Sequence, residues 1–325
     1  MAAIAAGATP RSAVDIPRLA LRPAGDPLSA PGPLAAALEG GGAAGEIVVR
    51  DAPPANARTV FVGRTVPVAT ASDKFLSVAV DTSQVIGGHW WSDAAATRRG
   101  LSPHRTAPFD FDRERLERLA AALGPAYLRV GGSEADAVRY VLDDGGEAAP
   151  SLDGELDFTG DHLDRVARFA ERVGYEIIFT LSAGPRYRDA AKRWDGAAAR
   201  RVIERAVERG YPIAVWELGN EVNAYPFLHG PGYWISGPRY AADIARLDAI
   251  VEEVDPDALV AGPASAYWPV WGETGWLYDG FLRSGGGRSV DVVTWHYYPQ
   301  QSWRCPVASR RARPGTVLDP ETLDE

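Results

Sequence analysis

The sequence is poor in the features that most often reveal a location or a cofactor. It has a single cysteine, Cys305, among 325 residues. One cysteine excludes an internal disulfide and leaves no thiolate cluster for a metal. No apolar run is long enough to span a bilayer. The first residues, MAAIAAGATPRSA, lack the basic start and apolar core of a signal peptide. The compartment stays open: cytoplasmic is the default, and a different natural start would allow secretion.

Positive charge is scarcer than negative charge. The chain has 34 Lys and Arg against 43 Asp and Glu, for a net charge of -9. This balance argues against nucleic acid as a partner. The hydrophobic content of 46% and charged content of 24% are typical of a soluble globular protein. Residues 1–45 are rich in Ala, Gly and Pro without periodicity, which predicts a disordered leader.

After this leader, apolar runs alternate with amphipathic segments. The runs predict strands at 75–81, 126–132, 176–183, 213–221, 258–263 and 290–298. Helical spacing predicts helices at 113–123, 161–174, 196–210, 238–254 and 276–283. Gly174 is the expected C-cap of the second of these helices. Strands and helices that alternate in this way predict a parallel sheet.

Two parallel folds fit this alternation. A doubly wound open sheet is disfavoured because no GxGxxG or Walker loop follows the first strand. The (β/α)8 barrel of TIM type fits better, although it needs eight strand-helix units and only six are visible. We therefore expect an incomplete barrel. In this fold, functional residues occupy the carboxyl ends of the strands.

The fourth expected strand ends in Trp216-Glu217-Leu218-Gly219-Asn220-Glu221. For an isolated Asn-Glu pair, a helix N-cap with a solvent-facing glutamate is the ordinary reading. At a strand tip in a barrel, the pair fits a retaining sugar hydrolase better. Glu221 can protonate the departing glycosidic oxygen, and the Asn220 amide can hold the sugar 2-hydroxyl. Glu217 faces the same way as Glu221, so it needs a buried partner, for which Arg129 is the candidate.

Tryptophans concentrate in the segments that follow the expected strands. Eight of the ten have this position: Trp90, Trp91, Trp194, Trp234, Trp268, Trp271, Trp276 and Trp303. Aromatic side chains are more often core than function. At one barrel mouth, however, their flat faces can stack on sugar rings.

Six motifs, in chain order, resemble glycoside hydrolase family 79, the heparanase and β-glucuronidase family of clan A. They are KFLSVAVDTS, AYLRVGGSEAD, GYEIIFTLSA, WELGNE, LVAGPA and VDVVTWHYY. The resemblance implies a barrel with an accessory β-sandwich that takes strands from the N-terminal side, with 46–50 and 58–62 as candidates. The implied domains are the leader 1–45, the sandwich strands 46–72, and a barrel over 73–325 cut before its seventh strand.

The resemblance also implies site residues. Glu221 matches the family's acid/base, and Asn220 its neighbour. Asp81, at the tip of the first strand, matches a glycone contact, and Ser133 replaces a family threonine. His296 and Tyr298 match pocket residues of the sixth strand. No metal and no organic cofactor are implied.

The family's nucleophile is a glutamate at the end of the seventh strand, so the resemblance places it outside this chain. A second chain or a missing C-terminal segment would complete the barrel, and this chain alone would be inactive. Glu273 is a lookalike, and we interpret it as a loop residue. Cys305 with His296 as its base is a minor alternative nucleophile.

The implied function is hydrolysis of β-glucuronides or of glycans that contain glucuronic acid. Two alternatives stay open. One is a clan A hydrolase of a neutral sugar, such as an arabinofuranosidase or xylosidase. The other is a non-catalytic carbohydrate-binding protein. The aglycone, endo or exo action and the oligomeric state cannot be read from the sequence.

Overall fold

The computed structural model describes residues 2–6, 71–90, 104–142, 156–268, 272–273, 277–301 and 308–313. All of them fall in one compact unit, which consists of Met1–Ala8 and Ala71–Glu325. The expected sandwich strands at 46–50 and 58–62, and Cys305, lie outside the described residues. The proposed division into leader, sandwich strands and barrel therefore stays a prediction. Residues Ala2–Ala6, within the expected leader, form strand β1.

Six parallel strands form the centre of the structure. They are β2 (Val78–Asp81), β5 (Ala126–Gly131), β8 (Tyr175–Leu181), β9 (Ile213–Leu218), β10 (Leu259–Trp268) and β12 (Val292–Tyr297). Their order in the sheet is their order in the chain, and every neighbouring pair is parallel. A doubly wound sheet would reverse its order at a switch point. The sheet is therefore an incomplete (β/α) barrel of TIM type, as the sequence predicted.

The edges of this sheet differ. At one edge, β1 pairs antiparallel with β12. At the other edge, β2 has β5 as its only partner among the described strands, and Val78 is 40% exposed. The short β11 (Gly272–Glu273) pairs antiparallel with β10.

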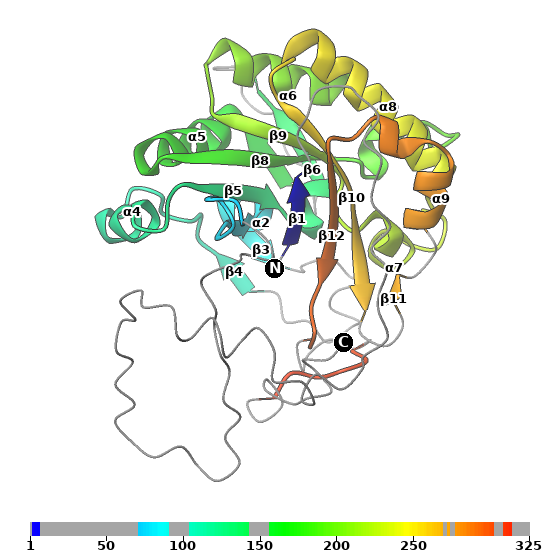
Figure 1. Cartoon of the computed structure of the whole chain (residues 1–325), viewed down its shortest axis with the longest axis horizontal. Helices are drawn as coiled ribbons and strands as arrows, with labels where there is room; N and C mark the ends of the chain where they lie inside the picture. Colours follow the sequence, from blue (N-terminus) through cyan, green and yellow to red (C-terminus); the bar gives the residue numbers. More distant parts are fainter. Residues whose placement is uncertain are drawn as a thin grey trace, which may run out of the picture. The chain divides into compact units, whose positions relative to one another are not determined.

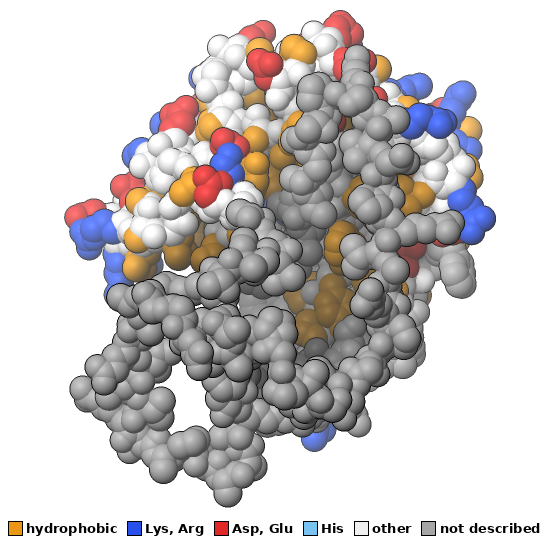
Figure 2. Space-filling model, viewed as in Figure 1, with side chains coloured by type: hydrophobic (Ala, Val, Ile, Leu, Met, Phe, Trp, Pro, Cys, Tyr) orange, Lys and Arg blue, Asp and Glu red, His pale blue; other side chains and the backbone are white. Residues whose placement is uncertain are grey.

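Five helices follow the strands and lie in an arc around the sheet (Figure 1). They are α4 (Glu114–Ala121), α5 (Gly160–Val173), α6 (Ala197–Glu208), α8 (Gly237–Val254) and α9 (Leu277–Arg283). Figure 2 shows charged side chains of both signs along this arc, with hydrophobic side chains between them on the α4 side. No helix among the described residues is long and apolar enough to cross a membrane.

Helix α5 matches the sequence pattern closely. Its apolar positions Leu163, Val166, Ala167 and Ala170 are completely buried. Gly174 caps it in the left-handed conformation at φ 72°, and its N–H bonds the carbonyls of Ala170 and Glu171. Glycine adopts this conformation without steric cost. The expected C-cap is therefore confirmed.

Helix α4 departs from its pattern. The segment predicted as a helix at 113–123 has apolar residues at helical spacing, but Leu119 is 58% and Leu123 is 50% exposed, while Ala120 is buried. The helix lies at the β2 end of the sheet and packs on α5 (Figure 1). Among the described residues no helix flanks its other side, so half of the apolar face is uncovered.

Short elements that the sequence did not predict lie between the main strands and helices. They are α2 (Thr82–Ile86), α7 (Tyr225–Leu228), the two-stranded pairs β3 (Gly88–Trp90) with β4 (His104–Thr106) and β6 (Val138–Val141) with β7 (Leu156–Thr159), and the 3-10 turns η1 (Ser133–Asp136), η2 (Pro185–Tyr187), η3 (Val222–Ala224) and η4 (Gly286–Arg288). Several of them follow the carboxyl ends of the parallel strands, where the candidate site residues lie.

Candidate active site

Glu221 lies just beyond the carboxyl end of β9. Its backbone is left-handed, at φ 51° and ψ 48°, which is uncommon for a residue other than glycine. Its N–H donates to the carbonyl of Ala264 at 3.0 Å, and the N–H of Gly219 donates to the carbonyl of Leu181 at 2.8 Å. Backbone strain held by such contacts is concentrated at functional sites. The strand tip is therefore fixed by both of its neighbours in the sheet.

His296 of β12 is the direct partner of Glu221. Its Nδ1 lies 3.0 Å from Glu221 Oε1, and the histidine is only 6% exposed. The His296 Nε2 atom is buried and has no hydrogen-bond partner among the described residues. The hydrogen bond fixes the orientation of the glutamate carboxyl. Two residues 75 positions apart in the chain are thus brought together.

Arg129 of β5 joins the interior of the barrel to the site. It pairs with Glu217 Oε2 at 2.7 Å, and it donates from Nη2 to Asn220 Oδ1 at 3.0 Å. The Thr180 hydroxyl donates to Glu217 at 2.7 Å. Burial opposes ionisation of Glu217, but Arg129 and the other charged and hydrogen-bonding neighbours hold its pKa below the usual range. The expected pairing of Glu217 with Arg129 is confirmed.

This network also orients the Asn220 side chain. Because Oδ1 accepts from Arg129, the amide nitrogen points elsewhere and stays available as a donor. A donor beside a general acid is suited to hold a hydroxyl of a bound sugar.

Asp81 and the paired glycines after β5 lie close together. A Cβ on Gly132, whose φ is 90°, would approach Asp81 Oδ1 to 2.6 Å, and one on Gly131 would approach the Arg129 guanidinium equally closely. Burial raises the pKa of Asp81, and Glu221 adds to the rise, while Arg129 and His296 oppose it. The two glycines therefore allow Asp81 and Arg129 to approach the site.

Tyr298 and Ser133 have fewer contacts with the other candidate residues than Asp81, Asn220 and His296 have. Tyr298, just after β12, is 52% exposed. Partial burial raises the pKa of Tyr298, and Glu221 and Asp81 add to the rise. Ser133 begins η1, and no hydrogen bond links it to the other candidate residues in the described part of the chain. The structure thus brings Asp81, Asn220, Glu221, His296 and Tyr298 into one neighbourhood and leaves Ser133 unconnected.

Asp136 is a site residue that sequence reasoning missed. Its two carboxylate oxygens accept from the backbone N–H groups of Ala183 and Asn220, both at 2.8 Å. It is 1% exposed, and burial raises its pKa to about 6 against these hydrogen bonds. Asp136 therefore ties the ends of β8 and β9 together beside the Asn220-Glu221 pair. The available signal was an acidic residue in the segment that follows the paired glycines.

Glu134 was missed in the same segment. Burial raises its pKa to about 7, and the charge of Asp81 adds to the rise. A second carboxyl therefore lies within electrostatic reach of the Asp81 carboxyl.

Two expectations about individual side chains are resolved outside the site. Glu273 accepts from the Ser265 hydroxyl at 2.5 Å and from the N–H of Tyr278 at 2.9 Å, so it supports the start of α9. The interpretation of Glu273 as a loop residue is corrected in one respect: it lies in the short strand β11, which pairs with β10 in the connection between β10 and α9. Trp194 was expected at the barrel mouth, but it is 1% exposed and donates from Nε1 to the carbonyl of Ser182. Trp234 is 50% exposed.

The parallel barrel sheet, with a glutamate and a histidine paired at its strand ends, has the architecture of a glycoside hydrolase. Residues 57–306 match the family model described as glycosyl hydrolase family 79, N-terminal domain. The chain belongs to glycoside hydrolase family 79.

Curated relatives agree with this assignment. The heparanase of Gallus gallus is 26% identical over 322 residues, which cover 84% of this chain and 54% of the relative. The protein named inactive heparanase-2 of Homo sapiens is 25% identical, over 71% of this chain and 45% of the relative. The chain spans about half the length of these relatives. Because one of them is named inactive, membership alone does not establish activity.

Solved structures give weaker similarity. A 4-O-α-L-rhamnosyl-β-D-glucuronidase from Fusarium oxysporum 12S aligns with a TM-score of 0.41 at 15% identity, over 72% of this chain and 46% of that one. The fold assignment depends on the strand order and the family match, and not on this alignment.

Proposed function

We propose that this chain carries the acid/base side of a retaining hydrolase of β-glucuronides, with Glu221 as the acid/base. The observation that supports this most is the geometry of the β9 tip. Glu221 is held in a left-handed backbone, is hydrogen-bonded to His296 at 3.0 Å, and follows an asparagine whose amide is fixed by Arg129.

The chemistry follows from these positions. Glu221 donates its proton to the glycosidic oxygen as the bond to the anomeric carbon breaks and a carboxylate attacks that carbon. In the second step Glu221 takes a proton from the water that releases the sugar. His296 keeps the carboxyl in place, and the Asn220 amide donates to the sugar 2-hydroxyl.

The nucleophile is proposed to lie outside this chain, on the seventh strand that the family resemblance implies. Glu273 is already engaged at the start of α9. Asp81 lies within electrostatic reach of Glu221, and its proposed role is glycone binding. Residues 1–325 alone are therefore expected to be inactive, and a second chain or a further segment would complete the site.

The glucuronide preference is supported by family membership and by Tyr298. Its hydroxyl lies near Glu221 and Asp81 and stays protonated at neutral pH, so it can donate to an acidic glycone.

The test compares nitrophenyl β-glucuronide with the glucoside, xyloside and arabinofuranoside. It uses a full-length protein that includes the proposed seventh strand and, in parallel, residues 1–325. The glucuronide should be hydrolysed fastest by the full-length protein and not at all by the shorter chain. Faster turnover of a neutral sugar would favour the other clan A activities, and no turnover of any substrate would favour a carbohydrate-binding protein.

A further inference from the structure

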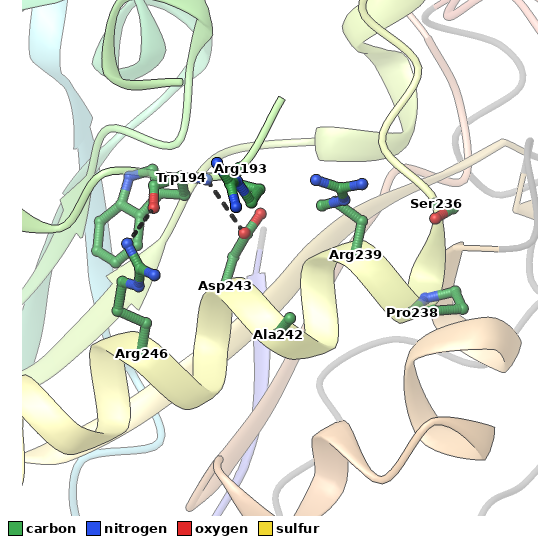
Figure 3. Close-up of a pocket in the computed structure, with 8 residues that line it drawn as sticks. All are labelled: Arg193, Trp194, Ser236, Pro238, Arg239, Ala242, Asp243 and Arg246. Atoms are coloured by element: carbon green, nitrogen blue, oxygen red, sulfur yellow. Dashed lines mark hydrogen bonds between the residues drawn. The ribbon is translucent and has the colours of Figure 1, made fainter. Parts of the chain in front are cut away.

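A surface pocket of about 420 Å³ lies beside α8 (Figure 3), and Glu221 is not among the residues that line it. One side is formed by the loop between η2 and α6, and the other by the start of α8. These segments follow the carboxyl ends of β8 and β9, so the pocket opens at the same end of the barrel. The lining residues that bear charge or hydrogen-bonding groups are Arg193, Trp194, Ser236, Arg239, Asp243 and Arg246.

The α8 residues share one face of the helix. Arg239, Asp243 and Arg246 are separated by four and three positions, and side chains at this spacing are neighbours on a helix surface. Figure 3 shows them in a row along α8, with Arg193 and Trp194 facing Asp243 and Arg246. The helical repeat therefore places two cations in the pocket on either side of one acid.

The negative charge of Asp243 is balanced by Arg188, which lies outside the pocket lining. Its Oδ2 accepts from Arg188 Nη1 at 2.6 Å, and its Oδ1 accepts from the N–H of Trp194 at 3.3 Å. Both side chains of this ion pair are buried, at 2% and 5% exposure. Burial raises the pKa of Asp243 while Arg188 lowers it most among the charged neighbours. The charges of Asp243 and Arg188 therefore offset each other, and Asp243 does not offset the charges of the arginines that line the pocket.

The pocket arginines keep their positive charge. Arg193 pairs with the exposed Asp189 at 2.7 Å. Arg239 and Arg246 form no ion pair within the described part of the chain. Arg239 contributes only a longer-range attraction to Asp243. The pocket therefore has a net positive charge that comes from Arg239 and Arg246.

Both guanidinium groups are held in place. Arg239 Nη1 donates to the carbonyl of Ala191 at 2.7 Å, and Arg246 Nη1 donates to the carbonyl of Trp194 at 3.0 Å. Each guanidinium has five N–H donors, so most of them stay available. A carbonyl contact fixes the direction of the group without cancelling its charge.

The start of α8 adds to this positive region. Its N-cap residue, Ser236, makes no side-chain cap hydrogen bond, so the first turn has no side-chain acceptor there. The partial positive charge of a helix N-terminus favours anions. This effect comes in addition to the two arginines and is not needed for the charge balance above.

We propose that this pocket binds an oxyanion group, a carboxylate or a sulfate, of an acidic ligand. Guanidinium groups bind planar or tetrahedral oxyanions through paired N–H donors. The volume accommodates a group as large as a sugar ring. The pocket is separate from Glu221, so its occupancy does not depend on hydrolysis.

The test measures binding to the full chain by isothermal titration at constant ionic strength. The ligands are sodium sulfate, sodium glucuronate and a sulfated disaccharide. The pocket variant is the double substitution Arg239→Gln and Arg246→Gln, in which glutamine keeps a donor for the carbonyl contacts. The matched control is Arg115→Gln and Arg168→Gln, because these arginines are exposed on α4 and α5 and the loss of charge is equal.

The pocket variant should lose at least about tenfold in affinity, the scale of one charge-assisted contact, while the control stays within about twofold. Tighter binding of a saccharide than of sulfate would show that the pocket reads the sugar as well. Equal binding would show that the oxyanion alone is recognised. Circular dichroism of each variant verifies that it is folded, and Arg239→Glu alone should also abolish binding. Absence of binding in the unmodified chain, or equal losses in both double variants, would overturn the proposal.

Discussion

Arg129 and Glu217 form an ion pair at 2.7 Å inside the barrel, where Glu217 is 1% exposed. The same guanidinium holds Asn220, the neighbour of Glu221. The position of the candidate acid/base therefore depends on a buried charge pair one layer below it.

Removing one member of this pair should be costly. Arg129→Met should lower the free energy of unfolding by about 3–5 kcal/mol, because it leaves Glu217 buried and unpaired. The double substitution Arg129→Met and Glu217→Met should recover most of this loss. The control is Arg200→Met, which breaks the more exposed pair with Glu253 and should cost under about 1 kcal/mol. Denaturant unfolding provides the measurement, and equal costs for the two single variants would contradict it.

Glu221→Gln should separate the two steps of catalysis in the full-length protein. Hydrolysis of a glucuronide with a poor leaving group should fall by about 10²–10⁴-fold, since no proton reaches the departing oxygen. An activated aryl glucuronide should still form the covalent intermediate, which mass spectrometry would detect. Glu273→Gln is the control, and its turnover should stay near that of the unmodified protein. Unchanged hydrolysis in Glu221→Gln would exclude this residue as the acid/base.

Tyr298→Phe tests the proposed glycone contact. It should lower kcat/KM for the glucuronide by about tenfold or more, because a buried polar group of the substrate loses its donor. Turnover of the corresponding glucoside should change little. A similar loss on both substrates would mean that Tyr298 acts on the site as a whole and does not select the uronic acid.

Asp136 should make the stability depend on pH. Its pKa is raised from 3.8 to about 6, so between these values the folded state binds more protons than the unfolded state. Protonated Asp136 therefore adds to the free energy of unfolding, and this stabilisation is fully present below about pH 4. It is lost as the pH rises through about 6, and the total loss is roughly 3 kcal/mol. Asp136→Asn should flatten the fall in unfolding free energy over this window. Glu134 titrates just above it, so some slope will remain.

The matched control for this prediction is Asp291→Asn. Asp291 is exposed and also accepts a backbone N–H, from Val260 at 2.9 Å. The flattening should be specific to Asp136→Asn. Parallel profiles for Asp136→Asn and the unmodified chain would show that the buried carboxyl does not carry the effect.

The sequence by itself determined the six parallel strands, the five helices that follow them, and the family. Helix α5 has four apolar positions at helical spacing and a glycine cap, and this pattern depends only on residues within one or two turns. The motif that ends in Glu221 could be recognised because its residues are contiguous. The pairing of Arg129 with Glu217 was also predictable, since a buried carboxylate on an inward-facing strand position requires a cation.

Tertiary structure alone decided which distant residues complete the site and which surfaces stay uncovered. Asp136 accepts the N–H of Asn220 from 84 positions away, and no local pattern encodes that distance. Trp194 is buried, and its indole N–H donates to the Ser182 carbonyl. Leu119 is exposed because α4 lies at the end of the described sheet. Spacing along the chain fixes which side of an element is apolar. Whether that side is covered depends on the neighbours that the fold brings to it.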